Sequence, residues 1–148
     1  GKYGEVLFCP FRLLEILNDI KLLTQALTKP MTLRATGAGV NTIDLLPPSK
    51  TGCLSLYISY NSISSLENIS QFKNLKALLM DFNEISRIED LRPLSKLKNL
   101  SILHLEGNPV CDLPLWDFHL LTLCPKLRVL NGQKTKDFLY SKSQIHHF

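Results

Sequence analysis

CLSLYISYNSI, residues 53–63, is the stretch that decides the fold, because two later stretches repeat its pattern: LKALLMDFNEI (75–85) and LSILHLEGNPV (100–110). Each stretch carries apolar residues at its first, fourth, sixth and last positions and an asparagine at its ninth. All twelve apolar positions are filled, with spacings of 22 and 25 residues between stretches. This self-similarity predicts a solenoid built from stacked, homologous coils.

Each stretch has the pattern of a short strand followed by a turn. Leu56 and Ile58 alternate with Tyr57 and Ser59, so the first pair points inward and the second outward. Stacked strands then form a parallel sheet, and each coil buries its apolar side only against its neighbours. An asparagine amide can both donate and accept hydrogen bonds where the strand turns away. We therefore predict a structural, non-catalytic ladder of Asn61, Asn83 and Asn108.

The segments that link the strands predict a different secondary structure. Apolar residues recur at every third position from Ile63 to Leu75 and again from Ile85 to Leu100. A period of three favours 3₁₀ turns, because residues spaced by three drift off one face of an α-helix. Pro93 also argues against an uninterrupted helix. The convex side is therefore expected to be 3₁₀ and short helical pieces, the longest in the 25-residue repeat.

Both ends of the solenoid are expected to carry helical caps, because an open stack leaves its terminal strands bare. Residues 11–29 have leucine and isoleucine on one helical face, with prolines before and after, and predict an N-terminal cap helix. Residues 108–137 predict a C-terminal cap: an apolar helix near 114–124 ended by Pro125, then a last strand at Leu127 to Leu130.

About four repeats are expected between the caps, over residues 33–110. The whole chain, residues 1–148, is expected to form a single domain, with residues 138–148 as a tail. The first repeat is degenerate. Aligning Asn41 with the asparagine ladder places four residues in its core positions: Leu33, Thr36, Ala38 and Ile43.

Composition places the chain among compact, non-membrane proteins. Its 148 residues are 45% hydrophobic with a formal net charge of +4, and no apolar run is long enough to cross a bilayer. Charged residues interrupt the apolar N-terminus, so we expect no signal peptide and an intracellular, cytoplasmic location, with the cytoskeleton and the nucleus as alternatives. Four cysteines without metal-ligand spacing favour reduced thiols over two disulfides: Cys9, Cys53, Cys111 and Cys124. The basic residues of the middle linkers are interpreted as a solvated convex face rather than a nucleic-acid surface.

One set of residues resembles a known family. Asn108-Pro109, the aromatic Trp116, Pro125 and the run Leu127 to Gly132 are similar to the C-terminal cap of an intracellular leucine-rich repeat subfamily. That subfamily is named for a regulatory subunit of protein phosphatase one, has repeats of about 22 residues, and includes the A-prime protein of a spliceosomal particle, an axonemal dynein light chain and centriolar proteins. The resemblance implies a right-handed α/β solenoid with a concave parallel sheet, which acts as a non-catalytic, monomeric adaptor without cofactors.

Binding is expected on the concave sheet, which solenoids use as their interaction surface. The repeat register places Tyr57, Leu79 and His104 in one column and Ser59, Asp81 and Glu106 in the next. Exposed aromatic residues beside carboxylates favour a groove for an amphipathic helix with a basic flank. The full set of predicted protein-binding residues is Tyr57, Ser59, Tyr60, Lys76, Leu79, Asp81, Phe82, His104, Glu106 and Arg128. The alternative for Tyr60 and Phe82 is that they pack beneath the turns.

Two other functions can be considered. Asp81, Glu106 and His104 would lie close together, but an open sheet offers nothing to exclude water, and one histidine with two carboxylates falls short of a closed zinc site. Catalysis is therefore not expected. The second is a ribonucleoprotein component like the A-prime protein, which would hold an RNA-binding partner. Basic residues could then touch RNA: Lys96, Lys98, Arg128, Lys134 and Lys136.

Overall fold

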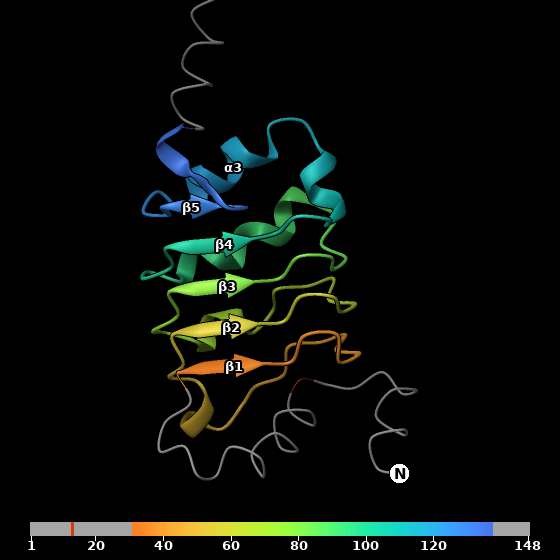
Figure 1. Ribbon diagram of the computed structural model, residues 1–148, viewed down its shortest axis with the longest axis vertical. Helices are drawn as coiled ribbons and strands as arrows, with labels where there is room; N and C mark the ends of the chain where they lie inside the picture. Colours follow the sequence, from red (N-terminus) through yellow and green to blue (C-terminus); the bar gives the residue numbers. More distant parts are fainter. Residues whose placement is uncertain (1–12, 14–30, 138–148) are drawn as a thin grey trace, which may run out of the picture.

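The computed structural model describes Leu13 and residues 31–137, and these form a stack of coils around one parallel sheet. Within the described residues the sheet has six strands in chain order: β1 (Thr32–Arg34), β2 (Ser55–Tyr57), β3 (Ala77–Leu79), β4 (Ile102–His104), β5 (Val129–Leu130) and β6 (Gln133–Lys134). Strands β1 to β5 pair in parallel. Figure 1 shows them stacked one above the next, each from a successive coil. The predicted solenoid is confirmed.

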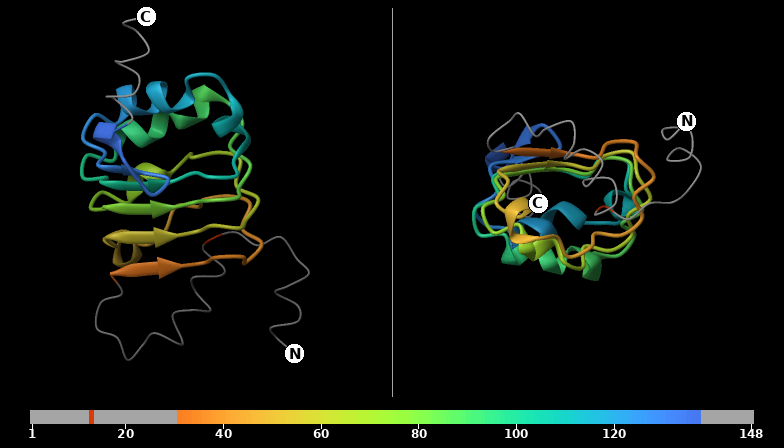
Figure 2. Two further views of the ribbon diagram at one scale, coloured as in Figure 1. Left: turned by 45° about the horizontal axis from the view of Figure 1, so that its top comes forward. Right: turned by 90° about the horizontal axis from the view of Figure 1, so that it is seen from below.

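The side opposite the sheet is built from 3₁₀ segments, as the period of three predicts. Seen along the stack in Figure 2, the strands line one side of a flattened coil and the 3₁₀ segments the other. They are η1 (Pro48–Lys50), η2 (Ile69–Gln71) and η3 (Ile88–Lys96), while a fourth 3₁₀ segment, η4 (Pro109–Asp112), belongs to the turn after β4. The nine-residue η3, with Pro93 inside it, lies in the 25-residue repeat. The expectation that this repeat has the longest helical piece is confirmed for the 3₁₀ segments.

The core consists of the twelve repeated apolar positions and the residues beneath them. Each of the twelve is at most 2% exposed. Phe72, from the linker after β2, is fully buried and adds an aromatic ring to a core otherwise dominated by leucine and isoleucine. Burial of this kind stabilises the fold by roughly 25 cal/mol for each Å² of apolar surface removed from water.

The asparagine ladder is the polar counterpart of this core. Asn83 is 5% exposed, and its side-chain oxygen accepts a hydrogen bond from the Ile63 N–H at 3.0 Å. Its amide nitrogen donates to the carbonyls of Ile58 at 2.9 Å and Met80 at 3.1 Å. Asn61 and Asn108 repeat this arrangement with their own preceding coils. The structural role predicted for the ladder is therefore confirmed, and each asparagine satisfies backbone groups of the coil before it.

The predicted register of the first repeat is wrong by three residues. Leu33 pairs with Leu56, so Ala38, rather than Asn41, stands at the ladder position. Thr36 and Asn41 are exposed, and the core positions are filled by Ala35 and Val40 instead. The physical reason is that ladder asparagines reach backward. The Asn61 oxygen accepts the N–H groups of Ala38 and Val40, so this coil is satisfied without an asparagine of its own.

The N-terminal cap predicted at 11–29 lies outside the described residues except for Leu13. That residue is helical and fully buried, and its N–H donates to the Thr42 carbonyl at 3.4 Å. The predicted tail, 138–148, lies outside the described residues as well.

The C-terminal end agrees with the sequence in two elements and adds a third. Helix α3 (Trp116–Leu123) stands where an apolar helix is expected, and β5 pairs with β4 as the predicted last strand. Strand β6 is not expected from the repeats and runs antiparallel to β5. Asn131 and Gly132 join β5 to β6 with φ angles of 50° and 78°, as a two-residue hairpin turn requires. The Asn-Gly pair is the signal that identifies this hairpin.

Candidate functional site

The concave sheet presents a central column of four aligned side chains. The strand register places Arg34, Tyr57, Leu79 and His104 side by side on β1 to β4. Tyr57, Leu79 and His104 are each half-buried, while Arg34 is exposed. The column predicted from the repeats is thus present, with one more member at its beginning.

Arg34 changes the accessibility of Tyr57. Its guanidinium carbon lies 4.5 Å from the centroid of the Tyr57 ring, a cation–π contact that covers one face of the ring. Sequence reasoning missed Arg34 because the three-residue error in the first repeat put it out of register. The pairing of Leu33 with Leu56 is what places Arg34 beside Tyr57.

The second column is tied together by Asp81. Its Oδ1 accepts the Glu106 N–H at 2.9 Å, and its Oδ2 lies 3.6 Å from His104 Nδ1. Its own N–H donates to the Ser59 hydroxyl oxygen at 3.1 Å. Ser59 is 8% exposed and therefore offers little accessible surface, contrary to the outward position expected for it. The Glu106 side chain remains exposed.

Tyr60 and Phe82 form an exposed stack of rings at the carboxyl ends of β2 and β3. Their centroids are 4.9 Å apart with an interplanar angle of 16°. The side chains are 61% and 47% exposed, so they do not pack beneath the turns. Both residues have left-handed backbone conformations, with φ angles of 58° and 55°. We call this pair the ring stack.

Glycine occupies the equivalent turn position on either side of the ring stack. Gly37 precedes it in the first coil and Gly107 follows it in the fourth, both with positive φ. A Cβ on Gly107 would lie 2.3 Å from Phe82 Cδ1, so the Phe82 ring packs directly over that glycine. The end of the stack nearer Gly107 is therefore closed by the backbone.

Charge is segregated across the coils. The turns after β2, β3 and β4, residues 59–65, 81–86 and 106–112, contain four carboxylates and no lysine or arginine: Asp81, Glu84, Glu106 and Asp112. We call this side the acidic edge. The segments leading into β2 to β5, residues 48–54, 71–76, 95–101 and 124–128, contain seven cations and no carboxylate: Lys50, Lys73, Lys76, Lys96, Lys98, Lys126 and Arg128. We call this side the basic edge.

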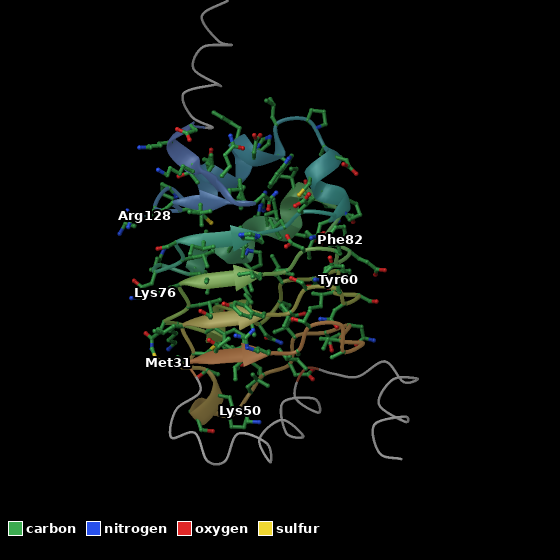
Figure 3. The ribbon with its side chains drawn as sticks, in the orientation of Figure 1. Met31, Lys50, Tyr60, Lys76, Phe82 and Arg128 are labelled. Carbon is green, nitrogen blue, oxygen red and sulfur yellow. The ribbon has the colours of Figure 1, made fainter. Side chains whose placement is uncertain are left out.

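Figure 3 places the labelled side chains accordingly. Lys76 and Arg128 lie at one side of the sheet, and Tyr60 and Phe82 lie at the other. Both cations are exposed, but the structure does not bring them together with the ring stack. The predicted binding residues therefore divide into a central column, the acidic edge with its rings, and two members on the basic edge.

Among the described residues, no group of three His, Cys, Asp or Glu side chains is arranged to hold a metal ion. A cavity of about 210 Å³ lies elsewhere, between η3 and the end of α3, and is lined mainly by apolar side chains with Lys98 and Lys126.

No helix within the described ranges has the length and apolar content to span a bilayer.

The thiols of the described cysteines are shielded rather than activated. Cys53, Cys111 and Cys124 are free, and burial raises the pKa of each thiol from 9.0 to about 11. A raised pKa disfavours the thiolate, which is the nucleophilic form. The preference for free thiols is confirmed for these three, and Cys9 lies outside the described residues.

The chain is similar to segments of proteins with diverse roles, and no family model matches it. It is 40% identical over 75 residues to mouse leucine-rich repeat-containing protein 56, covering 51% of this chain and 13% of that protein. It is 31% identical over 90 residues to the bovine geranylgeranyl transferase type-2 subunit alpha, covering 59% of this chain and 16% of that subunit. The chain thus spans less than a fifth of either relative, and one of them is an enzyme subunit.

A solved structure supports the same fold. The chain superimposes on a chain of the Drosophila melanogaster SNF/U2A' complex with a TM-score of 0.57 and 27% identity, covering 64% of this chain and 55% of the other. That relative occurs in a complex between proteins.

Proposed function

From the premise that this chain is a leucine-rich repeat protein, we propose that it is a non-catalytic adaptor that binds a protein partner, most simply a helix, on its concave sheet. The observation that carries the proposal is the central column. Leu79 and the Arg34–Tyr57 pair form a semi-apolar strip, in which Tyr57 and Leu79 are half-buried and Arg34 is exposed. Such strips become hot spots when a partner excludes water from them.

The resemblance of the C-terminal end to the phosphatase-regulator subfamily supports an intracellular adaptor in cytoskeletal, ciliary or phosphatase assemblies. The chain has the Pro109, Trp116 and Pro125 positions of that cap, and α3 occupies the segment between the last two. We propose that the chain acts as a monomer without a cofactor, because the solenoid exposes its own binding face.

A second candidate function is a role in a ribonucleoprotein particle, in which the chain holds an RNA-binding partner. Two observations favour it: the fold is shared with a chain of the SNF/U2A' complex, and the basic edge carries seven cations without a carboxylate. A one-signed strip of cations attracts phosphate backbones without reading sequence.

One capture experiment tests both functions. Tagged protein is incubated with cell lysate, and bound proteins are compared for the unmodified chain, Leu79→Glu on the concave face and Arg92→Glu on η3. The adaptor function predicts a partner that Leu79→Glu loses and Arg92→Glu keeps, with thermal melts showing that both variants remain folded. Partners lost equally from both variants would contradict it. Partners released by nuclease treatment would favour the ribonucleoprotein function instead.

A further inference from the structure

We infer that the ring stack and the acidic edge together form a docking place for an arginine side chain of the partner. The inference rests on the proposed adaptor function and names the chemistry that the concave face selects. The guanidinium group stacks on the Tyr60 end of the ring stack, and the carboxylates of the acidic edge, Asp81 and Glu106 among them, attract its charge.

The backbone at the rings indicates that they serve something other than folding. Four successive coils place a residue in the left-handed region at the same turn position: Gly37, Tyr60, Phe82 and Gly107. Glycine adopts this conformation without penalty, whereas bulky side chains disfavour it. Two large rings nevertheless occupy it while remaining 61% and 47% exposed. Strained residues of this kind persist chiefly where they contribute to function.

The geometry of the stack leaves a planar surface free. Phe82 is closed off by Gly107 on one side and by Tyr60 on the other. In the coil before Tyr60 the equivalent turn residue is Gly37, and a Cβ there would meet nothing within 4 Å, so no side chain fills the turn on that side. A planar group can therefore stack on Tyr60 and continue the array. A guanidinium group is planar and stacks on aromatic faces, whereas the lysine ammonium is a strongly hydrated point charge.

The charge around the stack selects a cation. The acidic edge carries four carboxylates and no lysine or arginine. Asp81 contacts His104 and the Glu106 N–H, but within residues 31–137 the Glu106 carboxylate has no hydrogen-bond or ion-pair partner. A nucleobase could also stack on Tyr60, but its phosphates would be repelled by this edge. An arginine side chain combines the planar group that can stack on Tyr60 with the positive charge that the acidic edge attracts.

The test uses alanine-based helical peptides as probes, each with the same basic positions filled by arginine, lysine or neutral citrulline. Binding to the whole chain is followed by the NMR shifts of the Tyr60, Phe82 and Glu106 amides. The arginine peptide should bind about two- to fivefold more tightly than the lysine peptide, the preference of an exposed cation–π site. The citrulline peptide should bind more weakly than either.

Two variants separate the rings from the charge. Tyr60→Asn with Phe82→Asn removes the rings while asparagine tolerates the left-handed turn, so the fold is kept. This variant should bind the arginine and lysine peptides equally. Glu106→Gln should weaken both peptides, whereas the matched control Glu67→Gln, on the exposed turn directly before η2 and outside the acidic edge, should weaken neither.

Each contrary outcome overturns the inference. If the unmodified protein binds the arginine and lysine peptides with equal affinity, the rings do not select arginine. The same conclusion follows if the preference for the arginine peptide survives replacement of the rings. Shifts confined to the basic edge, or no shifts at all, would also overturn it. These outcomes do not test the proposed adaptor function. That function is tested by the capture experiment, in which Leu79→Glu should lose the natural partner.

Discussion

Replacing Asn83 by alanine tests the asparagine ladder most directly. The side chain is 5% exposed and makes three hydrogen bonds of 3.1 Å or less to backbone groups, one on its own coil and two on the coil before it. Alanine leaves the Ile63 N–H and the Ile58 and Met80 carbonyls without these partners. Each lost bond costs about 1 kcal/mol, so the free energy of unfolding should fall by about 3 kcal/mol.

Urea denaturation monitored by circular dichroism measures this loss, with matched variants as a scale. Glu84→Ala changes the neighbouring, exposed residue and should alter stability by about 0.5 kcal/mol or less. Asn131→Ala removes a side-chain bond to the Leu105 N–H at 2.7 Å and places alanine at a φ of 50°, so the two losses together should cost about 2 kcal/mol. If Asn83→Ala and Glu84→Ala shift the denaturation midpoint equally, the ladder does not stabilise the fold and the reasoning is refuted.

Two further perturbations follow from the structure. Gly107→Ala should destabilise the protein by about 1–2 kcal/mol, because the φ of Gly107 is 77° and the added Cβ would displace the Phe82 ring. Gly37→Ala should cost less, because the space around Gly37 is open. Equal losses in thermal melts would show that the Phe82 ring does not pack over Gly107. Cys53 and Cys124 are buried and Cys111 is half-buried, so the three thiols should react slowly with a disulfide reagent at neutral pH in a Cys9→Ser background. Rapid labelling of native protein would contradict this shielding. Because burial raises their pKa from 9.0 to about 11, their contribution to stability is present below pH 9.0 and is lost as the pH rises toward about 11, which urea midpoints across that range will detect.

The repeats allowed most of the fold to be predicted because their physical requirements are local and recur. An apolar residue at each of twelve positions, together with an asparagine that satisfies its neighbour, leaves one consistent register from Cys53 to Val110. The register of the first coil could not be predicted in this way. Its backbone N–H groups are satisfied by Asn61 of the next coil, so the first coil has no ladder asparagine, and Asn41 matched the pattern by chance. The β6 hairpin lay beyond the repeat pattern and was indicated by Asn131-Gly132 alone.

The candidate site was predicted in part for the same reason. Register alone places Tyr57, Leu79 and His104 in a column, because alternation along a strand fixes which side chains face outward. It does not show that Arg34 covers Tyr57 or that Ser59 is buried against the backbone of the next coil. Those contacts depend on side-chain conformations and on how closely adjacent coils approach. The ring stack likewise required the left-handed turns, which the sequence pattern does not encode for tyrosine and phenylalanine.

The concave-face account is tested most directly by calorimetry with the partner that the capture experiment identifies. Leu79→Ala should weaken binding by about 2 kcal/mol, or about 30-fold, as expected of a central anchor. Arg92→Glu, on the opposite side of the coil, should leave the affinity within about twofold of the unmodified chain. A variant set in which Arg92→Glu abolishes binding and Leu79→Ala is silent would contradict the account and place the interaction on the convex side.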